Sequence, residues 1–166
     1  TDNIYAEQLK YASSKYLLAR LLLLLTVIWT TVSVPLSWLK SSMSCLHKKG
    51  ERCNPINYRA LSIICTVSKI LPKIILGRLR NTYEMLLMEN QFGFRQNRST
   101  TDAIFITCEA IKSTTKPLFL CMIDLKAAYD HIDRNLLFRV LEIRTKAPKI
   151  TNILKSLYTG TMAAIK

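Results

Sequence analysis

The chain has few acidic residues, little glycine, proline or histidine, and no paired cysteines. Its 166 residues include 11 Asp and Glu, four Gly, five Pro and two His. Such low glycine and proline contents exclude collagen-like and low-complexity chains. The five cysteines are scattered without a CxxC pair, and no secretory signal precedes them. We therefore expect free thiols, no zinc site, and an intracellular location in the cytoplasm, the nucleus or both.

Basic residues, in contrast, are abundant. The 24 Lys and Arg give a net charge of +13, and hydrophobic residues make up 49% of the chain. This length and composition fit about one domain with a core. A surface this basic indicates a polyanionic partner, either nucleic acid or an acidic membrane. A merely solvated basic surface is the alternative.

One apolar stretch raises the question of a membrane. Residues 21–39 carry no charged side chain and are long enough to cross a bilayer. Threonine and serine residues dilute the stretch, and Pro35 would interrupt a spanning helix. The pattern favours a buried or partner-covered helix over residues 5–31, and a membrane span stays open as the less favoured alternative.

Hydrophobic periodicity and turn-forming residues predict the remaining elements. In chain order they are a strand near residues 43–47, a basic loop to 57, a short apolar segment at 61–66, a helix at 67–88, a loop at 89–100, a helix at 101–112 opened by a Ser-Thr-Thr-Asp cap, a buried strand at 117–123, helices at 134–143 and 149–158, and the beginning of a strand from 161.

Four motifs follow one another in an order typical of one family. They are NYRALS at residues 57–62, SKILPKIILGRL at 68–79, NQFGFRQNRSTTDAI at 90–104, and IDLKAAYD at 123–130. The first three resemble the fingers of reverse transcriptases (RNA-directed DNA polymerases) of non-LTR, LINE-like retrotransposons. The fourth resembles the first palm motif of that family. The resemblance covers about residues 34–166, with Ala60 where the family usually has proline.

The resemblance implies an α+β fold. A mostly helical fingers subdomain with a short β-hairpin would run into the first strand or strands of an incomplete antiparallel palm sheet. We expect an N-terminal apolar helical segment at 1–33, a fingers-like part at 34–116, and the start of the palm at 117–166. The family's Gln-Gly and Tyr-x-Asp-Asp motifs do not occur in these residues. The chain is therefore expected to be an N-terminal fragment of the enzyme, cut before the later catalytic motifs and inactive alone.

Asp124 is the candidate catalytic residue. It follows a predicted buried strand, which would hold the carboxylate rigidly, and Mg²⁺ prefers such hard oxygen ligands. The resemblance implies that Asp124 and the backbone carbonyl of Leu125 are metal ligands, so that a two-ion Mg²⁺ site is only partly present. Read without the resemblance, Asp124 is more readily an N-cap of the segment that follows.

Other residues would bind the substrates that the family uses, which are a dNTP, an RNA template and a DNA primer. The resemblance implies that Lys49 and Arg59 bind the triphosphate, with Lys48 as the competitor of Lys49, and that Tyr129 packs beneath the incoming sugar. Arginine suits phosphate because its planar fork binds two oxygens. The alternatives are a solvated basic hairpin and a half-buried core tyrosine.

The QFGFR motif resembles the family's template-contacting loop. The resemblance implies that Phe94, Arg95 and Arg98 contact nucleic acid, and the alternative is a tight loop with solvated arginines. The predicted function is thus a reverse transcriptase fragment. A non-catalytic nucleic-acid-binding relic is the second hypothesis, and a small membrane-anchored protein is the third.

Overall fold

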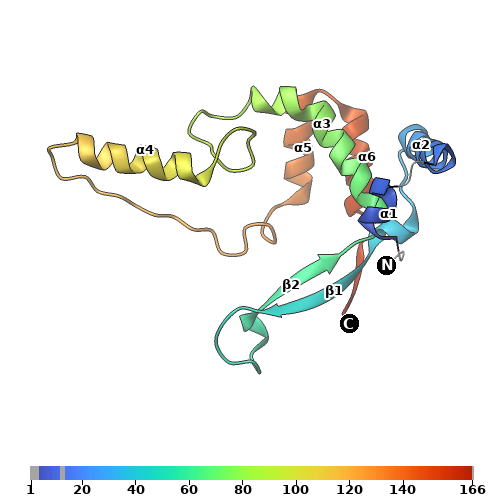
Figure 1. Ribbon diagram of the computed structural model, residues 1–166, viewed down its shortest axis with the longest axis horizontal. Helices are drawn as coiled ribbons and strands as arrows, with labels where there is room; N and C mark the ends of the chain where they lie inside the picture. The colour runs from blue at the N-terminus through green and yellow to red at the C-terminus, as the bar shows by residue number, and fades with distance from the viewer. Residues whose placement is uncertain (1–3, 12–13, 166) are drawn as a thin grey trace. The chain divides into compact units, whose positions relative to one another are not determined.

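The computed structural model describes residues 4–11 and 14–165 (Figure 1). The chain divides into two compact units, residues 1–78 with 146–166 (unit 1) and residues 79–145 (unit 2). The predicted α+β class is confirmed. The helices are α1 (Ala6–Tyr11), α2 (Lys15–Thr31), α3 (Ile70–Glu84), α4 (Thr100–Ser113), α5 (Arg134–Thr145) and α6 (Pro148–Tyr158), and the strands are β1 (Lys40–His47), β2 (Tyr58–Ile63) and β3 (Met162–Ile165). Short 3-10 helices lie at Leu36–Leu39, Pro55–Asn57 and Val67–Lys69.

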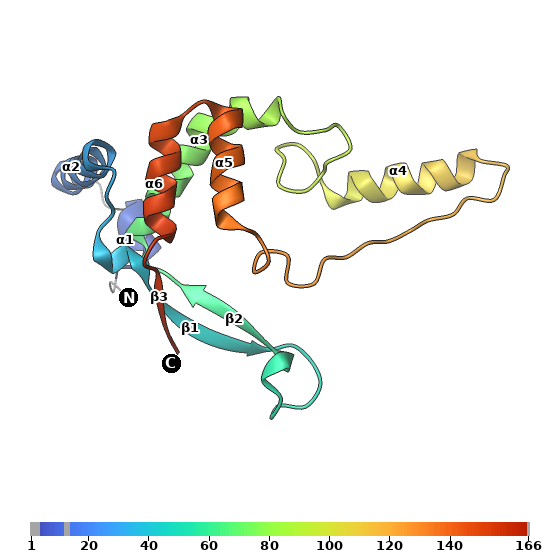
Figure 2. The same cartoon turned by 180° about the vertical axis from the view of Figure 1, so that it is seen from behind.

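The three strands of unit 1 form one sheet in the order β2-β1-β3. β1 and β2 form the predicted hairpin, antiparallel from the Ser42–Ile63 pair to the His47–Tyr58 pair. The strand expected from residue 161 is also present. However, β3 pairs with β1 in parallel and lies beside it in both views (Figure 2). It therefore extends the hairpin sheet and does not belong to a separate antiparallel sheet.

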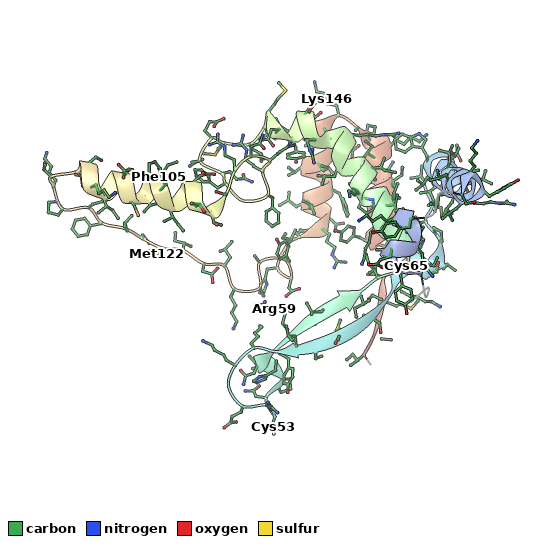
Figure 3. All side chains as sticks on the ribbon, in the orientation of Figure 1. Cys53, Arg59, Cys65, Phe105, Met122 and Lys146 are labelled. Carbon is green, nitrogen blue, oxygen red and sulfur yellow. The ribbon has the colours of Figure 1, made fainter. Side chains whose placement is uncertain are left out.

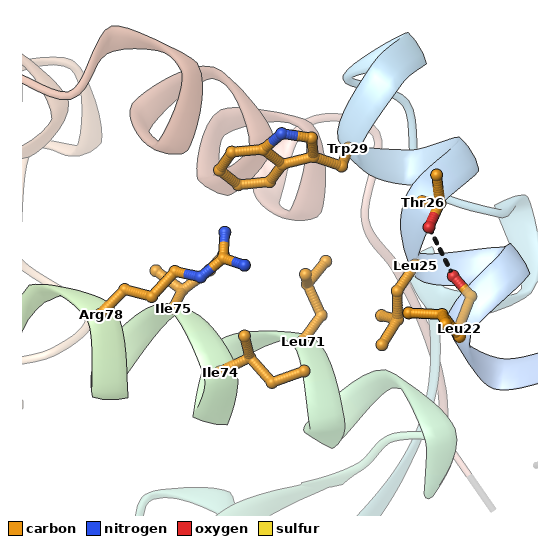
Figure 4. Close-up of a pocket in the computed structure, with 8 residues that line it drawn as sticks. All are labelled: Leu22, Leu25, Thr26, Trp29, Leu71, Ile74, Ile75 and Arg78. Carbon is orange, nitrogen blue, oxygen red and sulfur yellow. Dashed lines mark hydrogen bonds between the residues drawn. The ribbon is translucent and has the colours of Figure 1, made fainter. Parts of the chain in front are cut away.

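Helix α2 packs one face against α3. Leu22, Leu25 and Trp29 of α2 face Leu71, Ile74 and Ile75 of α3 across a cavity of about 230 Å³, which Thr26 and Arg78 also line (Figure 4). The guanidinium of Arg78 lies 4.8 Å from the ring centroid of Trp29, and the ammonium of Lys149 on α6 lies 5.1 Å from it. These two cation–π contacts connect α2 with α3 and α6.

The long uncharged stretch does not continue as one helix. α2 ends at Thr31, where Val32 takes a left-handed conformation (φ 56°) and its N–H donates to Ile28 O at 2.9 Å. Trp38 is then buried in a 3-10 turn. In residues 4–11 and 14–165, no helix is both long and apolar enough to span a bilayer. The single helix predicted from residue 5 is instead α1 and α2, and their junction includes residues 12 and 13, outside the described part.

In unit 2, the prediction of a buried strand at residues 117–123 was wrong. These residues have no regular structure, and every one of them is exposed. The side chain of Phe119, for example, is 93% exposed. A strand needs a neighbour to pair its backbone N–H and C=O groups, and among the described residues no strand of unit 2 lies alongside this segment. Sequence periodicity reports apolar character but not whether a pairing partner exists.

Side chains cap the N-termini of α4 and α5. The hydroxyl of Ser99 accepts from Asp102 N at 3.2 Å, and Asp102 Oδ2 accepts from Ser99 N at 2.7 Å. This capping box confirms the predicted cap of α4. Asp133 Oδ1 accepts from the backbone N–H groups of Asn135 and Leu136 at 2.8 and 3.2 Å, a cap of α5 that the sequence patterns did not indicate.

We expect Ser99→Ala to weaken α4 by about 1 kcal/mol, because the backbone N–H of Asp102 loses its acceptor. Hydrogen exchange of the α4 amides would show faster exchange in its first turn. Ser113→Ala is the matched control, since the Ser113 hydroxyl only donates back to Ala110 O within the last turn. Equal exchange in the two variants would contradict a stabilising role of the cap.

Candidate nucleotide and nucleic-acid site

The loop between β1 and β2 is closed by Asn57. Lys48 N donates to Asn57 O at 2.8 Å, and Asn57 Nδ2 donates to Glu51 O at 2.9 Å. Asn54 Oδ1 accepts from Ile56 N at 3.1 Å and shapes the turn that leads back into β2. Asn57 thus bridges the two ends of the loop, and this bridge restricts the conformations of the loop.

His47 and Tyr58 hold the base of the same loop. Their rings are in edge-to-face contact, with centroids 5.2 Å apart. His47 Nε2 lies 3.1 Å from Gly50 O, and the Tyr58 hydroxyl donates to Arg52 O at 2.9 Å. Both loop carbonyls are therefore bound by side chains of the strands. The loop is ordered by its own contacts.

Gly50 is required where it stands in this loop. Its φ of +87° is a conformation that other residues rarely adopt. A Cβ at this position would lie 2.8 Å from Asn57 Nδ2, which is inside van der Waals contact. A side chain at residue 50 would thus disturb both the backbone and the Asn57 bridge.

Lys49 and Arg59 are exposed cations in this framework. Lys49 lies in the ordered loop, and Arg59 lies in β2 opposite Leu46 of β1; Figure 3 labels Arg59 and Cys53 of the same hairpin. Among the described residues, neither cation forms an ion pair. Unit 1 therefore presents two predicted phosphate-binding residues on a hairpin, with Lys48 also exposed beside Lys49.

In unit 2, Arg95 is enclosed by the loop it belongs to. Its side chain is only 7% exposed, its Nε donates to Glu84 Oε1 at 2.7 Å, and its Nη1 donates to Met88 O at 2.9 Å. Glu84 Oε2 is buried and accepts no hydrogen bond from the described residues. The Arg95–Glu84 ion pair ties the loop to the end of α3, so Arg95 has a structural role there.

The other two loop residues differ from Arg95 in their surroundings. Arg98 pairs with Glu89, and its guanidinium lies 5.7 Å from the ring centroid of Phe92. Phe94 is 89% exposed, and its backbone is left-handed (φ +61°). That conformation costs a non-glycine residue about 1–2 kcal/mol. Of the three predicted contacts, Phe94 is the one whose side chain is fully open to a ligand.

Asp124 lies at the end of the extended segment of unit 2. It is exposed, and no described residue forms a hydrogen bond or ion pair with it, so it does not cap the turn that follows. That turn is closed by Asp130 N, which donates to Ala127 O at 3.0 Å. Leu125 and Tyr129 are exposed as well. Within the described ranges, no three His, Cys, Asp or Glu side chains are grouped so as to hold a metal ion.

The predicted residues are thus divided between the units. Lys49 and Arg59 belong to unit 1, and Asp124, Leu125, Tyr129 and the loop residues belong to unit 2. The sequence reading missed Asn57, Tyr58 and Glu84, which order the two loops. Asn57 and Tyr58 stand inside a recognised motif, whereas no local pattern connects Glu84 with Arg95. The assigned binding and metal roles of the predicted residues remain predictions.

The family of the chain is identified by comparison with models of known protein families. The family described as "Reverse transcriptase (RNA-dependent DNA polymerase)" matches residues 46–165, which include both loops and Asp124. The chain belongs to the reverse transcriptase family. The recognition of this family from the four motifs is therefore confirmed.

The chain is similar to three transposon proteins, two of which are named as probable RNA-directed DNA polymerases. A probable RNA-directed DNA polymerase from transposon BS of Drosophila melanogaster is 28% identical over 131 residues (73% of this chain, 14% of the relative). The transposon TX1 uncharacterized 149 kDa protein of Xenopus laevis is 26% identical over 136 residues (80% and 10%). A probable RNA-directed DNA polymerase from transposon X-element of Drosophila melanogaster is 27% identical over 104 residues (59% and 12%). The chain thus spans 10–14% of the length of these relatives.

In this reverse transcriptase chain, we expect Gly50→Ala to destabilise unit 1 by about 1–2 kcal/mol, because alanine disfavours positive φ. Gly77→Ala is the control, since Gly77 lies in α3 and a Cβ there would meet nothing within 4 Å. Alanine at residue 77 should stabilise the helix by about 0.5–1 kcal/mol, because it removes the backbone freedom of glycine. Urea unfolding monitored by circular dichroism measures both changes. Destabilisation by Gly77→Ala as large as that by Gly50→Ala would show that the loop geometry is not the cause.

Proposed function

We propose that this chain is part of a transposon-encoded RNA-directed DNA polymerase, in which it contacts an RNA template, a DNA primer and the incoming dNTP. The observation that supports it most is the hairpin loop inside the family-matching region. That loop is ordered by Asn57, His47 and Tyr58, and it presents exposed cations. An ordered loop loses little entropy when it binds a ligand, which favours a binding role.

In this proposal, Lys49 and Arg59 bind the triphosphate. A triphosphate concentrates negative charge on oxygens that accept charge-assisted hydrogen bonds. Arg59 would bind two oxygens through its planar fork, and Lys49 would act as a point charge. The pairing of β1 with β2 fixes the position of the Arg59 backbone within the hairpin. Tyr129, which belongs to unit 2, is separately proposed to pack beneath the sugar of an incoming nucleotide.

Asp124 and the carbonyl of Leu125 would hold Mg²⁺. The donor types fit, because both offer hard oxygen atoms, and the Asp124 carboxylate is exposed without a partner in the described residues. When bound there, Mg²⁺ would supply positive charge that favours loss of the primer hydroxyl proton and that offsets the negative charge on the leaving pyrophosphate. Asp124 is one carboxylate of a two-ion Mg²⁺ site that is only partly present in this chain, and it lies at the end of a segment without regular structure. The 166-residue chain by itself is therefore proposed to bind nucleic acid but not to extend a primer.

Arg59→Ala should weaken dTTP binding about tenfold or more, because a charge-assisted hydrogen bond contributes about 1.5–3 kcal/mol. Thymidine, which has no phosphate, should bind equally weakly to both proteins. Calorimetric titration of residues 1–166 measures these affinities, with Arg20→Ala on α2 as the control. An equal loss of dTTP affinity in Arg20→Ala would indicate a general effect of charge and would contradict a specific role of Arg59.

Residues 1–166 should bind single-stranded RNA with an affinity that falls steeply with salt, because its cations displace counterions from the phosphates. Asp124→Asn should leave this binding within about twofold, since Asp124 is assigned to the metal and not to the template. Fluorescence anisotropy between about 50 and 200 mM salt tests both statements. Primer extension by residues 1–166 at rates typical of polymerases, abolished by Asp124→Asn, would contradict the expected inactivity of the isolated chain.

A further inference from the structure

Phe94 is presented to solvent in an unusual way. Its side chain is 89% exposed, and its backbone has φ +61°, a conformation that bulky residues rarely adopt. Its neighbour Gly93 could adopt such a φ without cost, yet Gly93 is not among the positive-φ residues. The strain therefore falls on the aromatic residue. Strained backbone of this kind persists where the surrounding structure holds it, and it is frequent at functional sites.

The loop around Phe94 supplies that support. Arg95, the next residue, donates to Glu84 Oε1 and to Met88 O with its side chain almost completely buried. Arg80 Nη1 donates to Gln96 Oε1 at 2.9 Å, which fixes the loop two residues after Phe94. The ring is therefore carried by a braced loop and not by a free one.

The ring is open to solvent, because 89% of the Phe94 side chain is exposed. Apart from Phe92 and Phe94 themselves, no described heavy atom lies within 4 Å of the position that a Cβ at Gly93 would take. Phe92, on the other side of Gly93, is only partly exposed and lies near the guanidinium of Arg98. A flat ligand can therefore approach Phe94 without displacing the loop.

We propose that Phe94 stacks on an unpaired base of a nucleic acid strand and that Arg95 is the residue that positions it. This inference rests on the proposed function, because it identifies the ligand group that the loop would recognise. Every nucleobase has a π-face, and stacking on an exposed aromatic ring binds single strands with little sequence preference. Arg95 contributes through the loop and not through phosphate, because its guanidinium is occupied by Glu84 and Met88.

The test compares two single-stranded oligomers of equal length and charge, an oligothymidylate and an oligomer of abasic sugar phosphates. Wild-type residues 1–166 should bind the oligothymidylate at least about fivefold more tightly, because only that oligomer offers bases for stacking. Phe94→Leu should remove this preference and leave the affinity for the abasic oligomer unchanged. Phe94→Trp should retain the preference, since tryptophan also offers a π-face.

Phe119→Leu is the matched control, because Phe119 is 93% exposed but lies on a segment without regular structure. It should leave the preference unchanged. Arg95→Ala should reduce the preference while Phe94 is still present, and circular dichroism would show whether the helices persist. Retention of the full preference in Phe94→Leu, or its loss in Phe119→Leu, would overturn the inference but not the proposed function. Failure of the wild-type chain to bind either oligomer would overturn both.

Discussion

The backbone pairing of β1 is the interaction on which unit 1 depends. β1 is the central strand, bound to β2 on one side and to β3 on the other. The Ser41 hydroxyl donates to Met162 O, which connects residues 121 positions apart. The register also places His47 opposite Tyr58, and these two residues bind the carbonyls of the loop. A shift of one strand by one residue would turn all its side chains to the opposite face and would separate this pair.

Burial determines whether a basic side chain near each loop stabilises the loop or stays exposed for a ligand. Arg95 is enclosed, and its charge is compensated by Glu84, so it stabilises the loop that contains it. Lys49 in the hairpin loop and Arg59 in β2 are exposed, and neutral side chains, chiefly Asn57 and Tyr58, order the loop. The hairpin therefore keeps its cations available for an anion. In unit 2, the loop held by Arg95 leaves the aromatic ring of Phe94 exposed to solvent.

Local patterns in the sequence predicted the local structure. Most of the helices and the Ser99 cap follow from periodicity and capping residues. The β-hairpin was expected from the family resemblance, and the motif order identified the family. Whether residues 117–123 form a strand could not be predicted in this way, because a strand depends on partners elsewhere in the chain. Pairing of Glu84 with Arg95 was missed for the same reason. The left-handed conformation at Phe94, and not at Gly93, contradicts what residue preferences alone would suggest.

The parallel pairing of β3 with β1 has a consequence for synthesis on the ribosome. The hairpin of β1 and β2 can form soon after residue 63 is made, but its second edge receives β3 only after about a hundred more residues have been added. At about 5–20 residues per second, this interval lasts roughly 5–20 s. During it, the nascent hairpin exposes unpaired backbone groups that another strand can bind. Translation speed and chaperone binding in this window should therefore influence how much of the chain folds and how much aggregates.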